Sequence, residues 1–146
     1  MSLVRLVYVS SATQPLGDAE LAQILESSVR HNRTQGITGM LLYLEGTFMQ
    51  VLEGEDAAIN ETFERICEDD RHHDVFLLQQ VSVAEREFSR WHMSFCHLTP
   101  AEVLHYPEYA PIVRNRLDFA ALGIREGLAL DMLRTFYRQN SPAAPC

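Results

Sequence analysis

The sequence predicts an α+β domain, in which strands and helices alternate along most of the chain. Short apolar or β-branched runs recur between segments with helical spacing, and residues typical of turns separate them. With 146 residues, of which 47% are hydrophobic, the chain suits one globular domain with a substantial core. Beyond residue 99 the pattern becomes helical only, which predicts a tail attached to the mixed domain.

The first part of the chain predicts a strand, a helix and a β-hairpin. Residues 3–10, LVRLVYVS, are rich in β-branched side chains and favour a strand. Asp18 is the expected N-cap of a helix whose stripe covers residues 21–32 and which ends at Gly36. Two apolar segments, ITGMLLYLEG and TFMQVLEG, then favour a hairpin that turns at residues 45–46.

The next part predicts a second helix, two more strands and the tail. Residues 56–69 have a helical apolar stripe, residues 74–84 favour a fourth strand, and residues 90–98 favour a fifth. The order β-α-β-β-α-β-β predicts a ferredoxin-like sheet with both helices packed on one face. We expect a domain over residues 1–98 and a helical tail over residues 99–146, which packs on the sheet and frays at its end.

The tail contains an amphipathic stripe, which has two interpretations. The stripe consists of Ala129, Met132, Leu133, Phe136 and Tyr137. Such a helix can serve only to cover an open sheet face, or it can cover the face and also report the state of the sheet.

Composition and charge argue against several classes of partner. A net charge of -8 disfavours nucleic acid, whose phosphates bind clustered Lys and Arg. No stretch approaches the roughly 20 apolar residues of a membrane span, and the N-terminal stretch is a poor signal peptide. Three widely spaced cysteines and six histidines lack the spacing of a metal site. We therefore expect a cytoplasmic protein without a bound metal.

Several polar side chains occupy positions where the pattern favours apolar ones. Gln50 shares a strand face with Phe48 and Leu52, and an unpaired buried amide costs about 1–3 kcal/mol. The residues of this kind are Tyr8, Ser28, Asn32, Gln50, Arg65 and Asp69. They can be ordinary core and helix-end residues with satisfied hydrogen bonds. They can also form the polar rim of a slot between Ile24 and Ile66, which would suit a flat heteroaromatic ligand such as flavin. The pattern alone does not single out flavin.

Five stretches in this order resemble the BLUF domains, the blue-light sensors using FAD. They are LVYVSS, ILESSVRHNRTQGITGMLLY, GTFMQVLEG, ICEDDRHHDV and FSRWHMSF. The resemblance covers about residues 3–98, and the short helical tail resembles the stand-alone members, which carry no enzyme domain. It implies a photoreceptor and not an enzyme, with FAD bound non-covalently and FMN or riboflavin as possible substitutes.

The resemblance also implies a role for individual residues. Tyr8 matches the photoactive tyrosine and Gln50 the switching glutamine, while Trp91 and Met93 match fifth-strand residues that carry the signal. The cofactor-binding positions that it implies are Ile24, Ser28, His31, Asn32, Gln50, Arg65, Ile66, Asp69, Arg71 and His72. Within this set, Asn32 matches the asparagine on the pyrimidine edge, and Ile24 and Ile66 match the pair that sandwiches the ring.

In the mechanism that the resemblance implies, the excited flavin takes an electron and a proton from Tyr8 and then returns them. Gln50 is left with a rearranged hydrogen-bond pattern, and the absorption band is reversibly shifted to the red. Output then passes through protein–protein contacts to an unidentified downstream protein, and the chain is expected to form a homo-oligomer.

Two other functions stay open at this point. One is a light-insensitive flavin-binding or interaction module, which illumination would leave unchanged. The other is an enzyme of the acylphosphatase type, which shares the ferredoxin-like topology. The loop after the first strand, SSATQPLGD, has one glycine and no arginine, which disfavours a phosphate-binding loop.

Overall fold

The described residues form a five-stranded sheet with helices on both faces. The computed structural model describes residues 2–90, 92–110 and 126–139. The strands are β1 (Leu3–Ala12), β2 (Thr38–Leu44), β3 (Thr47–Glu55), β4 (His72–Ser82) and β5 (Ser94–Leu98). Their order across the sheet is β4-β1-β3-β2-β5, with β5 parallel to β2 and the other pairs antiparallel. The first four strands therefore have the ferredoxin-like arrangement that the sequence predicts.

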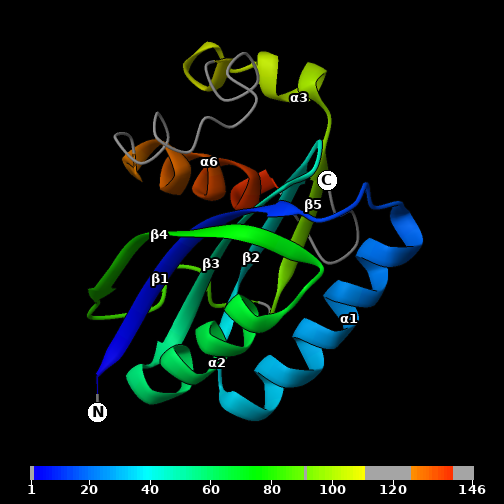
Figure 1. Cartoon of the computed structure of the whole chain (residues 1–146). Helices are drawn as coiled ribbons and strands as arrows, with labels where there is room; N and C mark the ends of the chain where they lie inside the picture. The colour runs from blue at the N-terminus through cyan, green and yellow to red at the C-terminus, as the bar shows by residue number, and fades with distance from the viewer. Residues whose placement is uncertain (1, 91, 111–125, 140–146) are drawn as a thin grey trace.

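Helices cover the two faces of the sheet unequally. Figure 1 shows α1 (Asp18–Gln35) and α2 (Asp56–Glu68) on one side of the sheet and α6 (Glu126–Gln139) on the other. Two separate clusters of buried apolar side chains follow this division. One lies under α1 and α2 and includes Leu21 and Ile59. The other lies under α6, whose predicted stripe from Ala129 to Tyr137 is buried.

Local signals set the turns of the first half. Gly36 adopts the left-handed conformation with a φ of 68° and ends α1, as predicted. Glu45 and Gly46, with φ values of 43° and 85°, form the two-residue turn between β2 and β3. Two positive φ values in sequence give a turn whose twist matches that of the flanking strands. The N-cap of α1 is Gly17, so the prediction that Asp18 caps the helix is wrong by one residue.

The strand predictions near the end of the domain need two corrections. The fourth strand begins at His72 instead of residue 74. The fifth strand begins at Ser94 instead of residue 90, because its partner β2 pairs with it only from Met40 onwards. The stretch before Ser94 uses its polar groups in other contacts; for example, Nδ1 of His92 lies 2.9 Å from the carbonyl oxygen of Ile37.

The described part of the tail after β5 is helical. It begins with α3 (Pro100–Leu104), where the Thr99 hydroxyl caps the first turn by accepting from the backbone N–H of Glu102. A short 3-10 helix, η1 (Pro107–Tyr109), follows, and α6 comes later. Within these described segments, no helix is long and apolar enough to cross a membrane.

Candidate functional site

A cavity of about 130 Å³, here called the slot, lies between α1, α2 and the sheet face that these helices cover. Its lining side chains come from β1, α1, β2, β3, α2, the connection after α2 and the first residue of β4. They are Tyr8, Ile24, Ser27, Ser28, His31, Asn32, Leu41, Phe48, Gln50, Leu52, Thr62, Arg65, Ile66, Asp69, Arg71 and His72. The slot therefore combines apolar, amide, hydroxyl and charged groups.

Helical periodicity explains how α1 and α2 present their residues to the slot. Ile24, Ser28 and Asn32 follow one another at intervals of four residues and so lie on one face of α1. Thr62 and Ile66 have the same spacing on α2. Each helix thus contributes one isoleucine together with polar groups, which gives the slot aliphatic walls and a polar rim.

A chain of three hydrogen-bonded side chains forms part of the slot and its surroundings. Tyr8 on β1 and Gln50 on β3 are directly opposite each other in the antiparallel pair, so their side chains stand on the same face. The Tyr8 hydroxyl donates to Oε1 of Gln50, and Nε2 of Gln50 donates to Sδ of Met93 at 3.4 Å. Each of the three residues is 4% exposed. The buried amide thus has a partner at both ends.

The Tyr8 hydroxyl keeps its proton in this environment. Burial raises the pKa of Tyr8, and electrostatic interactions with Cys67 and Asp69 raise it further. A phenolate would be desolvated there and would lie near the Asp69 carboxylate. Tyr8 is therefore a neutral hydrogen-bond donor at ordinary pH.

His31 links α1 to α2 at the rim. Its Nε2 lies 2.9 Å from the hydroxyl oxygen of Thr62, and the Arg65 guanidinium contacts Nδ1. A guanidinium can only donate, so Nδ1 accepts and the ring proton is on Nε2. Burial lowers the pKa of His31, and the positive charge of Arg65 lowers it further. Both effects favour the neutral ring.

Asn32 connects the slot to the segment that precedes β5. Its side chain is 2% exposed, and Nδ2 donates to the carbonyl oxygen of His92 at 2.8 Å. His92 is the neighbour of Met93, which contacts Gln50. The stretch before β5 therefore touches the slot at two amides, Asn32 and Gln50.

The opposite end of the slot carries charged and aromatic groups. Nε of Arg71 donates to Oδ1 of Asp69 at 2.9 Å, and the backbone N–H of Arg71 donates to the same oxygen at 3.0 Å. The hydrogen bond from the Arg71 side chain is the main reason that the pKa of Asp69 is lowered. Nδ1 of His72 lies 2.7 Å from the Ser10 hydroxyl, and its Nε2 lies 2.5 Å from the carbonyl oxygen of Ile66.

The structure brings the residues singled out by the sequence together. Every residue expected to bind the cofactor lines the slot, and so does Tyr8. Met93 contacts Gln50 but precedes β5, so its expected position on the fifth strand is wrong. Trp91 lies outside the described residues.

Five lining residues were missed by the sequence-based prediction: Ser27, Leu41, Phe48, Leu52 and Thr62. For three of them, the spacing along the strand or helix places the residue on the same face as a predicted site residue. Phe48 and Leu52 alternate with Gln50, and Thr62 lies one turn before Ile66. An apolar residue or a threonine at these positions is ordinary, and nothing in the pattern separates lining residues from packing residues.

The fold and the slot define a ligand-binding ferredoxin-like domain. Aliphatic walls suit the faces of a flat ring, and the amides Asn32 and Gln50 offer both donors and acceptors to its edge. Charged groups at the other end suit a polar or anionic extension of the ligand. Among the described residues, no cluster of three His, Cys, Asp or Glu side chains has the arrangement of a metal site.

Comparison with known proteins identifies the family. The model of the BLUF family, sensors of blue light using FAD, matches residues 3–94. This match covers more than half of the chain, and the chain belongs to the BLUF family. FAD is therefore its cofactor, and the chemistry of the slot fits such a ligand.

Relatives and solved structures agree with this assignment. The photoactivated adenylate cyclase subunit beta of Euglena gracilis is 38% identical over 91 residues, which are 62% of this chain and 11% of that protein. The dark-state structure of BlrB, a BLUF protein, has a TM-score of 0.70 at 29% identity and covers 87% of this chain and 92% of its own. The photo-activated state of BlsA has a TM-score of 0.74 at 28% identity, with coverage of 90% and 94%.

The length of these relatives limits which of their properties can be assigned to this chain. The chain spans about a tenth of the length of the curated relatives that it matches. The structure of a bacterial light-regulated adenylyl cyclase, with a TM-score of 0.72 and 31% identity, is covered over 36% of its length. The matched family is described as sensors of blue light that use FAD. BLUF domains are joined to effector domains such as cyclases in other proteins.

Proposed function

We propose that this BLUF domain is a reversible blue-light switch in which Tyr8 and Gln50 perform the switching step. The observation that carries the proposal is the hydrogen-bonded chain from the Tyr8 hydroxyl through Gln50 to Met93. It joins a proton donor, an amide with two different ends and a residue outside the slot. Such a chain can convert a change at the ligand into a change at the segment before β5.

The lining residues suggest how FAD would be held. Ile24 and Ile66 would contact the two faces of the isoalloxazine ring, and Asn32 and Gln50 its polar edge. Ser28, His31 and Arg65 lie along the rim, and Asp69, Arg71 and His72 are available toward the ribityl-phosphate end. Most of these residues would contact the isoalloxazine ring, which FMN and riboflavin share with FAD. FMN or riboflavin could therefore replace FAD.

The switching step follows from the protonation of Tyr8 and the two ends of Gln50. When bound, FAD would supply a ring that absorbs blue light and, once excited, can accept an electron from a nearby phenol. Tyr8 is neutral, so loss of an electron makes its hydroxyl strongly acidic, and Oε1 of Gln50 is the acceptor that its hydrogen bond already engages. Gln50 can answer by rotation or tautomerisation, because its amide has a donor end and an acceptor end. Return of the electron from the ligand and of the proton from Gln50 would restore Tyr8, and the new hydrogen-bond pattern of Gln50 would remain as the signalling state.

The route of output is also a proposal. Residues 1–98 would form the sensing domain and residues 99–146 a tail that packs on the sheet and presents the signal to a partner protein. Burial of the α6 stripe against the sheet supports this division. Self-association and a cytoplasmic location remain predictions from the sequence.

The visible spectrum of the purified, FAD-loaded chain tests the proposal. It is recorded in darkness, under blue light and after a return to darkness. We expect two flavin bands that shift to the red in light and recover in the dark. Flavin bands that stay fixed would leave a light-insensitive binding module, and a chain that cannot be loaded with FAD would contradict the use of the slot.

A further inference from the structure

Glu53 is a buried carboxylate on the strand that carries Gln50. Among the described residues it is the one charged side chain in the buried set, with an exposed fraction of 0%. Side chains alternate along β3, so Glu53 and Val51 point to the face under α6, while Gln50 and Leu52 point to the face with the slot. The same short strand thus reaches the slot with one side chain and the tail-covered face with another.

Glu53 is held by backbone N–H groups of the loop between β4 and β5 and by an arginine of β1. The backbone N–H of Phe88 donates to Oε1 of Glu53 at 2.6 Å, and that of Glu87 donates to Oε1 and Oε2 at 2.9 and 3.1 Å. Arg5 on β1 places Nη1 3.8 Å from Oε2. Burying a charge is costly unless it is paired and hydrogen-bonded, so these groups explain how the carboxylate is tolerated.

Arg86 fixes the same loop from a second direction. Nη1 donates to the Thr38 hydroxyl at 2.9 Å and to the carbonyl oxygen of Glu53 at 2.8 Å. Nη2 donates to the carbonyl oxygen of Gly36 at 2.7 Å. The loop is therefore attached to the end of α1, the start of β2 and the end of β3.

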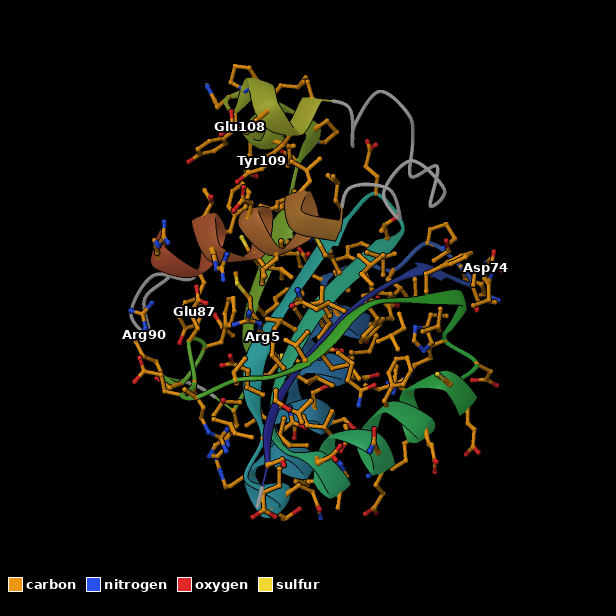
Figure 2. The ribbon with its side chains drawn as sticks, turned by 90° about the vertical axis from the view of Figure 1, so that its left-hand side faces the viewer. Arg5, Asp74, Glu87, Arg90, Glu108 and Tyr109 are labelled. Atoms are coloured by element: carbon orange, nitrogen blue, oxygen red, sulfur yellow. The ribbon has the colours of Figure 1, made fainter. Side chains whose placement is uncertain are left out.

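The outer side of the loop holds α6. Glu87 accepts two hydrogen bonds from Arg134 of α6, at 2.5 and 2.9 Å. The backbone N–H of Arg90 donates to the Tyr137 hydroxyl at 2.9 Å, and its guanidinium donates to the Tyr137 carbonyl oxygen at 3.0 Å. Figure 2 shows Glu87 and Arg90 close to α6; Arg5 of β1 lies beside Glu87, with Nη1 3.3 Å from Oε1.

The inner end of this segment touches the slot. Met93 accepts from Gln50, and the carbonyl oxygen of His92 accepts from Asn32. Residues 86–90 and 92–93, here called the coupling segment, therefore contact the slot at one end and α6 at the other. Between the two ends the segment is fastened to Glu53.

Given the output route proposed above, in which the segment before β5 and the tail carry the light signal, we propose that Glu53 is the positioning residue that makes transfer from Gln50 through the coupling segment to α6 possible. The proposal rests on the proposed function, because it needs a light-driven change at Gln50. A rearranged Gln50 changes its hydrogen bond to Met93 and displaces the inner end of the segment. Anchoring at Glu53 prevents the loop from absorbing this displacement locally, so the contacts of Glu87 and Arg90 with α6 change instead. Light then loosens α6 from the sheet.

Hydrogen–deuterium exchange of the FAD-loaded full chain measures this loosening directly. Peptides that cover residues 126–139 are compared in darkness and under blue light, with the visible spectrum recorded in parallel. In the unmodified chain we expect exchange in these peptides to be at least threefold faster in light. The light/dark ratio is the decisive quantity, since a purely structural weakening raises exchange in both conditions and keeps the ratio.

Glu53→Gln is the main variant. It preserves the shape of the side chain and removes the charge that Arg5 faces. It also places an amide N–H group, which is a donor, against the backbone N–H of Glu87, which is a donor as well. We expect the red shift to persist and the light/dark ratio to fall toward 1. Glu55→Gln is the matched control, because Glu55 is an exposed residue at the end of the same strand; it should behave like the unmodified chain.

Arg134→Gln is the second variant and tests the same coupling if Glu53→Gln fails to fold. Arg134 lies on α6 and is partly exposed, so its replacement should not prevent folding. We expect a retained red shift and a reduced ratio. A red shift in the unmodified chain with a ratio of 1, or an unchanged ratio in a folded Glu53→Gln or Arg134→Gln chain, would overturn the coupling proposal alone. An unmodified chain without any red shift would overturn the proposed function, and the coupling with it.

Discussion

Replacement of Tyr8 and Gln50, first singly and then together, tests whether the two side chains act as a pair. Tyr8→Phe removes the hydroxyl and leaves Oε1 of Gln50 buried without its donor. Gln50→Leu leaves the buried hydroxyl without its acceptor. An orphaned buried polar group costs about 1–3 kcal/mol, so each single variant should lose about that much stability.

The double variant distinguishes pairing from simple burial. With Phe and Leu present together, no polar group of the pair remains to be desolvated, and replacing both partners by apolar groups of similar shape is nearly neutral. The double variant should therefore be more stable than the sum of the single changes predicts, by about 2–6 kcal/mol, which is twice the cost of one orphaned group. For a chain of this size, 1 kcal/mol corresponds to about 4 °C in Tm.

Thermal unfolding of the flavin-free chain, followed by far-ultraviolet circular dichroism, gives the four Tm values of the cycle. The FAD-loaded forms are then illuminated, and we expect none of the three variants to show the red shift while all retain bound flavin. Additive Tm changes would refute the energetic pairing of Tyr8 and Gln50. A normal red shift in either single variant would remove that residue from the switch.

Three further predictions concern the scaffold and the rim. Gly39→Ala should prevent folding, since a Cβ there would lie 2.0 Å from the carbonyl oxygen of Val51. Gly127→Ala is the control and should be tolerated, because a Cβ there meets no atom within 4 Å. Soluble yield and circular dichroism of the two variants test this difference. Leu133→Ala should lower the free energy of unfolding by about 2–5 kcal/mol in a urea titration, because this side chain of α6 is fully buried; an unaffected titration would show that α6 does not contribute to the core. Asp69 has a lowered pKa through a hydrogen bond from the arginine two residues along, so its stabilisation is present above the ordinary value of 3.8 and is lost as the pH falls through the folded-state value. The Tm difference between the unmodified chain and Asp69→Asn should accordingly exist at pH 7 and disappear in strong acid, and a difference that persists there would contradict the ionic explanation.

Much of the fold is predictable because it depends on neighbours in the sequence. The turn at Glu45 and Gly46 and the end of α1 at Gly36 require local backbone conformations that glycine favours. The start of β5 was not predictable in this way, because the stretch before it is apolar enough to form a strand. Asn32 and Ile37 bind His92 there, and no local pattern reveals those contacts.

The candidate site also has residues that the sequence reveals and contacts that only the folded chain shows. Gln50 is conspicuous in the sequence because a carboxamide interrupts an apolar face, and the BLUF resemblance points to Tyr8. Their contact spans 42 positions and depends on the register of β1 with β3. Side chains such as Thr62 reach the slot only because α2 packs beside α1, so their type alone does not mark them as lining residues.

The sequence by itself determined the strand and helix periodicities, the main turns and the polar residues that interrupt apolar faces, because each depends on residues a few positions apart. The tertiary structure alone decided which of these residues meet and which charges are buried. Glu53 illustrates the difference: near the end of an apparently ordinary hairpin strand it looks like a solvated glutamate. It is buried because the backbone N–H groups of Glu87 and Phe88, more than thirty positions away, arrive to compensate its lost hydration. Compensation of a buried charge is a long-range property, and only the folded chain supplies it.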